Sequence, residues 1–231
     1  MQKMIKISNR LKTIASMVDR NAIVADVGTD HCFLPIYLVQ SGKVNKCYAS
    51  DIKEGPLSAG RKNVNAYGLA DKITLTLADG ISQLQEDVTT VTISAMGGSL
   101  MTNILSSNKD KLKNVNTIIC QPNVGGFTIR KWLVNNDYMI VDEKIFKEAG
   151  RFYEVIKAIR GEDYLTDQEI LFGPCLLKEM SPVFIEKWTN ELAFVSSTIR
   201  KIPRGSDDYN RLRAYKANIE QMFKSIQDLL G

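Results

Sequence analysis

The sequence predicts an α/β fold, in which a Rossmann-like seven-stranded sheet precedes a C-terminal antiparallel helical hairpin, or coiled coil. Apolar strand-like runs alternate with helix-compatible segments over residues 22–160. Three of these runs end on an aspartate, at Asp26, Asp51 and Asp79, which are 25 and 28 residues apart. This spacing suits one strand and one helix per acid.

The elements follow in order along the chain. Apolar residues at helical spacing over residues 8–18 predict an amphipathic helix, with Ser8 as its N-cap. Parallel strands are then predicted at residues 22–27, 46–51, 73–78, 90–95 and 117–121. Two further strand-like runs, 139–146 and 151–159, are joined by a turn too short for a crossover helix, so they pair antiparallel or lie apart. Five parallel strands with this ending are the class I methyltransferase pattern.

A domain boundary is predicted near residues 161–166, which gives a cofactor-binding domain at 1–163 and a helical domain at 164–231. In the helical domain, apolar residues step by three and four over 185–202 and again over 212–229. This pattern predicts two helices with heptad seams that pack as a hairpin. The seams fit a dimer as well, so we expect a monomer but leave a dimer open.

Composition limits the classes of function. The chain has 231 residues, 44% of them hydrophobic, and a formal net charge of +4. No apolar run approaches the roughly 20 residues that span a bilayer, and no apolar leader follows the opening MQKMIKISNRLK, so we expect a cytoplasmic protein with no membrane partner. Four cysteines without C-x-x-C spacing and a single histidine favour no metal site.

The segment VADVGTDHCFLPIYL, residues 24–38, predicts a nucleotide-cofactor cradle. Gly28 lets the backbone approach a ligand. A dinucleotide turn of the form G-x-G-x-x-G would need glycine at Asp30 and Phe33, and a carboxylate there repels a pyrophosphate but not a cationic sulfur. The turn therefore favours S-adenosylmethionine over NAD as the cofactor.

The strand-end acids have matching roles. Asp51 is suited to accept from the hydroxyls of a ribose, and Asp79 from an exocyclic amine on the base. The residues predicted to contact the cofactor are Asp26, Gly28, His31, Asp51, Ile52, Asp79, Gly80 and Met96. Taken singly, a strand-end aspartate is as often a helix N-cap, and a lone histidine is more often a polar contact than a base.

Residues after the fourth and fifth strands are predicted to receive the substrate. Two glycine pairs, 97–98 and 125–126, leave room for a flat group, although the second pair fits an ordinary turn equally well. Amide side chains there offer donors and acceptors to a base edge, and aromatic residues 152 and 153 stack on a base or else belong to the core. The predicted substrate contacts are Gly97, Gly98, Gln121, Asn123, Arg151 and Tyr153.

Basic side chains gather near the N-terminal helix and around the connection at residues 200–216. Both groups are suited to RNA phosphates, although solvated helix faces have the same composition. The predicted RNA contacts are Arg10, Lys12, Arg200, Lys201, Arg204 and Arg211.

The strings DVGTDHCFLP, LADG, SAMGG, QPN with its glycine pair, and KEAGRFYE together resemble the bacterial tRNA (adenine-22)-N1-methyltransferases over nearly the whole chain. The family strings are closer to DIGSDHAYLP and AGMGG, so Thr29, Cys32, Phe33 and residues 94–95 are mild departures that leave the acids and glycines in place. The resemblance implies an S-adenosylmethionine domain, a C-terminal coiled-coil domain that aids tRNA binding, and methylation of N1 of an adenine in the D-arm of tRNA.

The chemistry of such a transfer requires mainly alignment, because adenine N1 already carries an in-plane lone pair. Asp30 is the candidate catalytic residue that stabilises the positive charge as it moves to the ring, although an N-cap role fits it equally. The alternatives are a class I methyltransferase that acts on another RNA or a small molecule, and a non-catalytic RNA-binding module with a degenerate pocket.

Overall fold

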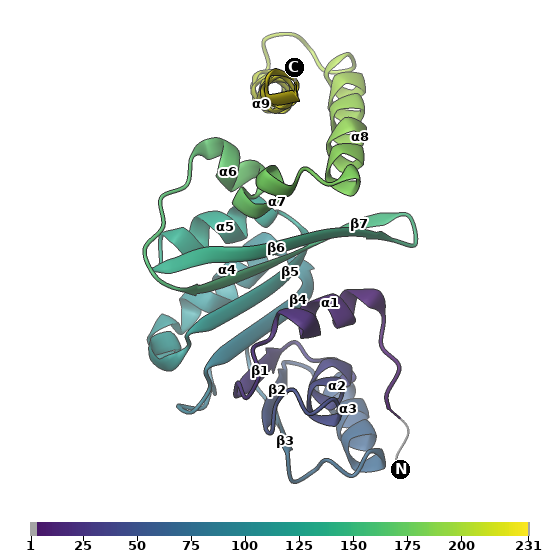
Figure 1. Ribbon diagram of the computed structural model, residues 1–231, viewed down its shortest axis with the longest axis vertical. Helices are drawn as coiled ribbons and strands as arrows, with labels where there is room; N and C mark the ends of the chain where they lie inside the picture. The colour runs from purple at the N-terminus through teal and green to yellow at the C-terminus, as the bar shows by residue number, and fades with distance from the viewer. Residues whose placement is uncertain (1–3, 231) are drawn as a thin grey trace. The chain divides into compact units, whose positions relative to one another are not determined.

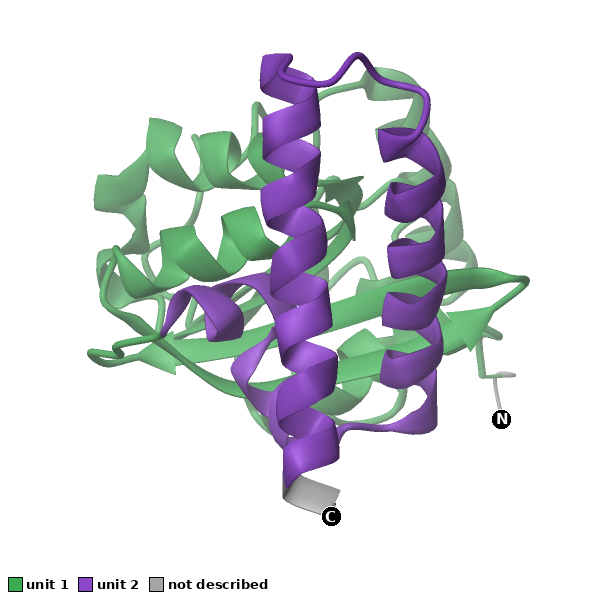
Figure 2. Ribbon diagram, turned by 90° about the horizontal axis from the view of Figure 1, so that it is seen from above, with its two compact units in different colours: residues 1–165 green, residues 166–231 purple. Residues whose placement is uncertain are grey.

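The computed structural model describes the backbone of residues 4–230 and the side chains of residues 4–228. The chain divides into two compact units, residues 1–165 and residues 166–231, which Figure 2 shows in green and purple. The division falls two residues beyond position 163, where the sequence places the domain boundary. The roles expected of the two domains remain predictions.

The described residues of the first unit form a seven-stranded mixed sheet, which confirms the predicted fold class. Its strands in chain order are β1 (Val24–Val27), β2 (Cys47–Asp51), β3 (Ile73–Leu77), β4 (Thr90–Gly97), β5 (Thr117–Val124), β6 (Tyr138–Glu148) and β7 (Arg151–Arg160). The strand order is β3-β2-β1-β4-β5-β7-β6, with β1 to β5 parallel and β7 antiparallel to both of its neighbours. The last two strands therefore pair antiparallel, and β7 lies between β5 and β6.

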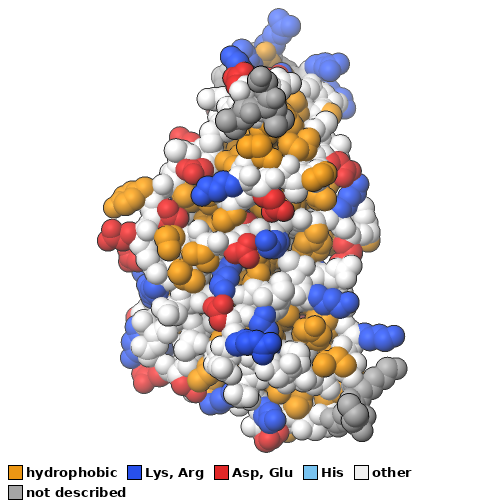
Figure 3. Space-filling view, viewed as in Figure 1, with side chains coloured by type: hydrophobic (Ala, Val, Ile, Leu, Met, Phe, Trp, Pro, Cys, Tyr) orange, Lys and Arg blue, Asp and Glu red, His pale blue; other side chains and the backbone are white. Residues whose placement is uncertain are grey.

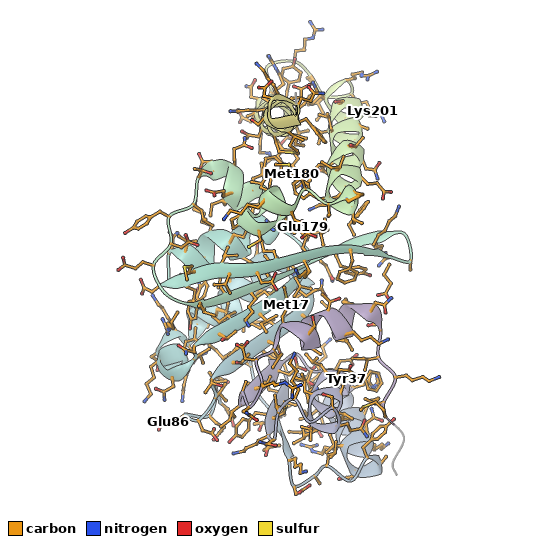
Figure 4. The ribbon with its side chains drawn as sticks, viewed as in Figure 1. Met17, Tyr37, Glu86, Glu179, Met180 and Lys201 are labelled. Carbon is orange, nitrogen blue, oxygen red and sulfur yellow. The ribbon has the colours of Figure 1, made fainter. Side chains whose placement is uncertain are left out.

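Helices connect the consecutive parallel strands except β3 and β4, where residues 78–89 form turns and not the helix-compatible segment that the sequence suggests, and the central strand β1 is buried along its whole length (Figure 1). The helices of this unit are α1 (Asn9–Met17), α2 (Phe33–Gln40), α3 (Glu54–Ala66), α4 (Gly98–Ser107), α5 (Gly126–Val134) and the short 3-10 helix η1 (Lys109–Asn114). Ser8 caps α1 by accepting from Leu11 N, as predicted. Met17 on α1 is buried in the core cluster and Tyr37 on α2 packs against it (Figure 4).

The carboxyl ends of β1 to β5 meet at one edge of the sheet, because the strands are parallel and in register. Asp51 ends β2, and Gly97 ends β4. Gly28 follows β1 directly, and Asp79 comes two residues after β3. The topology thus places most of the predicted site residues along a single edge.

The end of the β6–β7 hairpin extends past the rest of the sheet (Figure 1), because β7 pairs with β5 only over residues 156–159 but pairs with β6 along its whole length. Helix α1 braces this arm. The backbone N–H of Asn9 donates to Glu148 Oε1 near the end of the arm at 3.1 Å. Asp19, two residues after α1, lies 2.6 Å from the Nζ of Lys157, which is in the part of β7 that pairs with β5.

A buried group of three charges joins α5 to the hairpin. Arg130 is 1% exposed, and its guanidinium contacts Glu143 on β6 at 2.6 Å and Glu154 on β7 at 2.8 Å. A charge is buried at tolerable cost only when it is paired and hydrogen-bonded, so these contacts hold α5 in a defined position on the sheet.

The second unit is helical, with α6 (Asp167–Phe172), α7 (Pro174–Glu179), α8 (Pro182–Ile199) and α9 (Asp207–Leu230). Helices α8 and α9 lie side by side and run in opposite directions (Figure 2), and the Tyr215 hydroxyl donates to Glu191 Oε1 at 3.2 Å between them. The end of α7 at Glu179 and Met180 leads into α8 (Figure 4).

The buried stripe of α8 differs from the predicted seam. Phe184 is fully buried although the seam begins at Ile185, which is only half-buried. The reason is that α6 also packs here: the rings of Phe172 and Trp188 meet edge to face, with centroids 4.5 Å apart. Val195 and Ile219 are buried as the seams predict. The last seam position, Leu229, lies outside the described side chains.

Candidate cofactor and substrate site

A cavity of about 400 Å³ opens at the carboxyl edge of β1 to β4. Its size suits a small ligand, since such sites typically enclose about 300–1,000 Å³. The residues that line it are Val27, Gly28, Asp30, Asp51, Ile52, Lys53, Pro56, Ala78, Asp79, Gly80, Ser94, Ala95, Met96, Leu100 and Ile104. Of the eight predicted cofactor contacts, six are therefore together in this wall, and Asp26 and His31 are not among the lining residues.

Asp26 lies beneath the first turn. Its carboxylate is 4% exposed and accepts from the hydroxyls of Thr29 and Thr92, both at 2.7 Å. Burial raises the pKa of Asp26, and the two hydroxyl donors partly oppose that rise. Asp26 thus stabilises the turn from below and does not line the cavity, so its contact with a ligand stays a prediction.

Gly28 lines the cavity directly after β1, where the sequence predicts that the backbone approaches a ligand. Its φ is +72°, and a Cβ built there would lie 2.2 Å from Met96 Cε. The backbone N–H groups of Gly28 and Thr29 both donate to Ser50 O at 2.9 Å, which ties the turn to β2. A side chain at position 28 would be strained and would force the Met96 side chain to shift.

Asp51 and Asp79 both face the cavity, as the sequence predicts. Asp51 Oδ1 accepts from Lys53 N at 2.9 Å, and Oδ2 accepts from Asp30 N at 3.3 Å. Each carboxylate oxygen has a second lone pair, so Asp51 keeps acceptor capacity for a ligand hydroxyl. Asp79 is exposed, and next to it Gly80 has φ +55° and a Cβ there would meet Ile104 at 2.8 Å.

The cavity wall is acidic. Three carboxylates, those of Asp30, Asp51 and Asp79, line it beside a single cationic residue, Lys53. Such a wall repels phosphates and favours a ligand with positive charge. Two lining residues, Leu100 and Ile104, were missed by the sequence prediction; their spacing of four residues on the helix after the SAMGG turn is the signal that would have found them.

His31 does not line the cavity, and its side chain contacts two neighbouring residues in the turn. Its ring stacks on Phe33 with centroids 5.4 Å apart, and Nε2 lies 3.5 Å from Asp30 Oδ1. Its backbone carbonyl accepts from Asn63 Nδ2 at 2.9 Å. These contacts place His31 beside Asp30 at the mouth of the turn.

The two glycine pairs meet where β4 and β5 end. A Cβ on Gly98 would lie 2.2 Å from the carbonyl oxygen of Gly125, whereas the nearest atom to a Cβ on Gly97 is 3.9 Å away. Gly125 has φ +76°, and a Cβ on Gly126 would lie 2.8 Å from Glu154 Oε2. The second pair is therefore required by close packing as much as by a turn.

The side chains of Gln121 and Asn123 both form hydrogen bonds to the backbone of Ala95. Ala95 is a bulge in β4 with φ +63°, a conformation that costs a non-glycine residue roughly 1–2 kcal/mol. Its N–H donates to Gln121 Oε1 at 3.3 Å, and its carbonyl accepts from Asn123 Nδ2 at 2.9 Å. The two amides thus stabilise a strained loop at the cavity rim.

Gln121 is not positioned as a base reader. It is fully buried, its Oε1 also accepts from Arg10 Nη1 at 2.9 Å, and its Nε2 donates to Pro122 O at 3.0 Å. Arg10, predicted to bind RNA, is half-buried by this contact and links α1 to the end of β5. Asn123 is exposed and remains available to a substrate.

The hairpin residues lie apart from the cavity wall. Arg151 is exposed at the hairpin end, and the ring of Tyr153 stacks on Phe146 with centroids 5.6 Å apart. The exposed apolar side chains beside the glycine pairs are instead Leu100, Val124 and Phe127, which are 53%, 72% and 51% exposed. The sequence prediction missed Phe127, although it directly follows the second glycine pair.

The other predicted RNA contacts are exposed. These are Lys12 on α1 and, in the second unit, Arg200, Lys201, Arg204 and Arg211. Figure 4 marks Lys201 at the end of α8, and Figure 3 shows basic side chains projecting around the helical hairpin. Arg211 pairs with Asp208 at 2.8 Å on the surface. Within the described residues, no helix is long and apolar enough to cross a membrane, and no cluster of three His, Cys, Asp or Glu side chains is arranged to hold a metal ion.

Comparison with known proteins identifies the family. Residues 24–227 match the family model described as tRNA (adenine(22)-N(1))-methyltransferase. The Bacillus subtilis protein of that name is 35% identical over 225 residues, which are 94% of each chain. The structure of a Streptococcus pneumoniae protein in complex with S-adenosyl-L-methionine is 38% identical, with a TM-score of 0.87 over 94% of this chain and 99% of that one.

A Mycoplasma capricolum protein of the same family was solved with S-adenosyl-homocysteine. It is 28% identical, with a TM-score of 0.85, and the match covers 93% of this chain and 96% of that one. Both the family model and the B. subtilis relative agree with the resemblance carried by the strand-end motifs. The chain belongs to the tRNA (adenine(22)-N(1))-methyltransferase family.

Proposed function

We propose that this protein transfers a methyl group from S-adenosylmethionine to N1 of adenine 22 in tRNA, and that it does so in the cytoplasm. The observation that carries the proposal is the acidic cavity at the strand ends. Next to it lie the two glycine pairs, 97–98 and 125–126, and exposed apolar side chains. The family that the chain belongs to supports the same reaction.

The donor set of the cavity fits S-adenosylmethionine. Asp51 is placed to accept from the ribose hydroxyls, and Asp79 from an exocyclic amine. Gly28 leaves the space that a methionine moiety needs next to Met96. The acidic wall suits a sulfonium, and S-adenosylmethionine supplies there a methyl group that is already activated for transfer.

The protein's task in the reaction is alignment and charge stabilisation. The N1 lone pair of adenine forms the new N–C bond as the S–C bond breaks, so no proton has to leave N1 and no nucleophilic side chain is required. The positive charge moves from sulfur to the adenine ring. Asp30 lines the cavity with an exposed carboxylate, and it stabilises the cationic ring as the charge develops.

The second unit is assigned to tRNA binding. Its exposed basic residues at the α8–α9 connection are suited to phosphates, and each neutralised phosphate releases counterions. Buried residues on both helices, among them Val195 and Ile219, close the seam within the chain, which supports a monomer.

The test is methyl transfer to a defined RNA. Purified protein with labelled S-adenosylmethionine is incubated with an unmodified tRNA transcript, and primer extension then maps the modified nucleotide. We expect a stop one nucleotide before adenine 22, and no label in a transcript that carries guanine at that position. Absence of label in every tRNA would contradict the proposal, and a stop at another adenine would correct its position.

A further inference from the structure

The strained residue Ala95 lies at the boundary between the cavity and the substrate side. It lines the cavity together with Met96, and it is exposed. Of the two side chains that bond to it, Gln121 is buried and committed to other partners, whereas Asn123 is exposed. Of these two amides, only Asn123 is therefore placed to offer a polar group to a bound base at this point.

The orientation of the Asn123 amide is set by its partner. The carbonyl oxygen of Ala95 only accepts, so the group that faces it at 2.9 Å must be the Asn123 NH2. This leaves Oδ1 on the other side of the amide plane, and within the described residues no group donates to it. Asn123 thus presents a fixed hydrogen-bond acceptor at the cavity rim, preorganised before a substrate arrives.

The surroundings of this acceptor suit an aromatic base. Val124 follows Asn123 directly and is 72% exposed, and Phe127 is 51% exposed in the first turn of α5. In the sheet register Gly97 pairs with Val124, so the open glycine lies beside these side chains. Apolar groups for the face of a base and one acceptor for its edge are thus adjacent.

Adenine carries its 6-amino group next to N1, and N1 must stay free to attack the methyl group. A single acceptor aimed at the amino group therefore holds the ring without blocking the nucleophile. We propose that Asn123 Oδ1 accepts a hydrogen bond from the 6-amino group of the target adenine, and that this contact selects adenine over other purines. Guanine presents an oxygen at that position, which the Asn123 oxygen repels. The proposal rests on the proposed function and adds the residue that reads the base.

The experiment pairs a substrate change with a protein change. Two tRNAs are prepared, one with adenosine and one with purine riboside at position 22; the second lacks the 6-amino group but keeps the N1 lone pair. Single-turnover transfer rates are measured for the wild type and for Asn123→Ala with both tRNAs. We expect the preference for adenosine to fall by about tenfold or more in the variant, because only the adenosine rate depends on the hydrogen bond to the 6-amino group.

The ratio separates base reading from loop support. Loss of the hydrogen bond from Asn123 to Ala95 is expected to slow transfer to both tRNAs equally, so this effect cancels in the ratio of the two rates. The lower intrinsic reactivity of purine is the same in the wild type and the variant, so it cancels when their ratios are compared. Gln121→Ala is the matched control, since it removes the other hydrogen bond to Ala95 and is expected to leave the preference unchanged. Equilibrium binding of the two tRNAs in the presence of S-adenosylhomocysteine gives the same ratio if transfer to purine is too slow to follow.

An adenosine preference in Asn123→Ala equal to that of the wild type, in rate or in binding, overturns the assignment of Asn123. A wild type that transfers no methyl group to the adenosine tRNA overturns the proposed function instead, so the two failures are distinguishable.

Discussion

Single residues at the ends of β4 and β5 are constrained to different degrees although they look alike in the sequence. Gly97 and Gly98 are neighbours, yet only Gly98 faces a backbone atom, the Gly125 carbonyl oxygen, at 2.2 Å from its Cβ position. A backbone neighbour cannot move aside as a flexible side chain can. The constraint on position 98 is therefore steric, whereas a Cβ at position 97 would have its nearest neighbour 3.9 Å away, in ordinary contact.

This difference predicts the behaviour of two alanine variants. Gly98→Ala is expected to lower the free energy of unfolding by about 1–3 kcal/mol, because the new Cβ forces the two loops apart. Gly97→Ala has the nearest atom 3.9 Å away and is expected to change it by less than about 0.5 kcal/mol. Urea unfolding of both variants measures the difference; equal losses of stability would show that the two loops do not pack closely at Gly98.

Asp26 predicts a pH dependence of stability. Burial raises its pKa above the ordinary value of 3.8, so the folded protein holds this proton more tightly than the unfolded chain does. The stability that the group contributes is present below pH 3.8 and is lost as the pH rises through the raised pKa. Asp26→Asn does not ionise, so the stability of the variant relative to the wild type is expected to improve as the pH rises from about 4 to 7. Urea midpoints across this range test it, and a relative stability that is constant or falls with pH would contradict it.

At the level of secondary structure, helix α5 is held in place by carboxylates on two strands, β6 and β7. The Arg130 guanidinium lies between Glu143 on β6 and Glu154 on β7, and Glu154 also approaches Gly126 at the start of the helix. The same helix begins at Gly126, next to the end of β5, and carries Phe127 in its first turn. The position of α5 on the sheet therefore determines where the exposed side chain of Phe127 lies.

Arg130→Met tests the seating of α5. The variant leaves two buried carboxylates without the guanidinium, and we expect a loss of about 3–5 kcal/mol in the free energy of unfolding. The control, Asp142→Asn, removes the exposed pair with Lys144 at 3.2 Å and is expected to cost less than about 1 kcal/mol. Similar unfolding midpoints for the two variants would show that the buried group does not anchor the helix.

Phe127 lies in the first turn of α5, and we expect its substitution to affect tRNA binding without affecting S-adenosylmethionine binding. Phe127→Ala is expected to raise the KM for tRNA by about tenfold, since stacking of a base on an aromatic ring contributes about 1–3 kcal/mol. The dissociation constant for S-adenosylmethionine, from calorimetry, is expected to stay unchanged because Phe127 does not line the cavity. Phe127→Tyr keeps the ring and should restore the wild-type KM; a normal KM in the alanine variant would remove Phe127 from the substrate site.

At the scale of the whole molecule, we propose that the two units have different roles. All the residues that line the cavity belong to the first unit, whereas Arg200, Lys201 and Arg204 belong to the second. Cofactor binding and tRNA binding are therefore expected to respond to different substitutions.

A triple variant of full-length protein tests this division. Replacing Arg200, Lys201 and Arg204 by glutamine is expected to weaken tRNA binding and to reduce the slope of log affinity against log salt by about 0.7–0.9 for each phosphate that is no longer neutralised. Affinity for S-adenosylmethionine is expected to stay the same. The matched control replaces the exposed Lys109, Lys111 and Lys113 on η1, with the same change in charge. Equal salt slopes for the two triple variants would refute the assignment of the α8–α9 connection to RNA.

Local patterns predicted most of the framework. The period of apolar residues located all seven strands, and the acids at strand ends Asp51 and Asp79 line the cavity as expected. Other residues depended on contacts that no local pattern reveals. Gln121 and Arg10, 111 positions apart, were expected to meet a base and a phosphate and instead bond to each other. Tyr153 was expected either to stack on a base or to belong to the core, and its ring stacks on Phe146.

The alternation of elements, the acidic edge of the sheet and, through the motifs, the family could all be predicted from the residues alone, because strand period and strand-end chemistry are local properties of the chain. Which of the two amides is exposed at the cavity rim and which bonds inside the protein could be seen only after folding brought distant residues together. That choice depends on the bulge at Ala95 and on the packing of α1 against β5, where burial requires every polar group to find a partner within the protein. Gln121 meets that requirement inside, and Asn123 is left with an oxygen to offer.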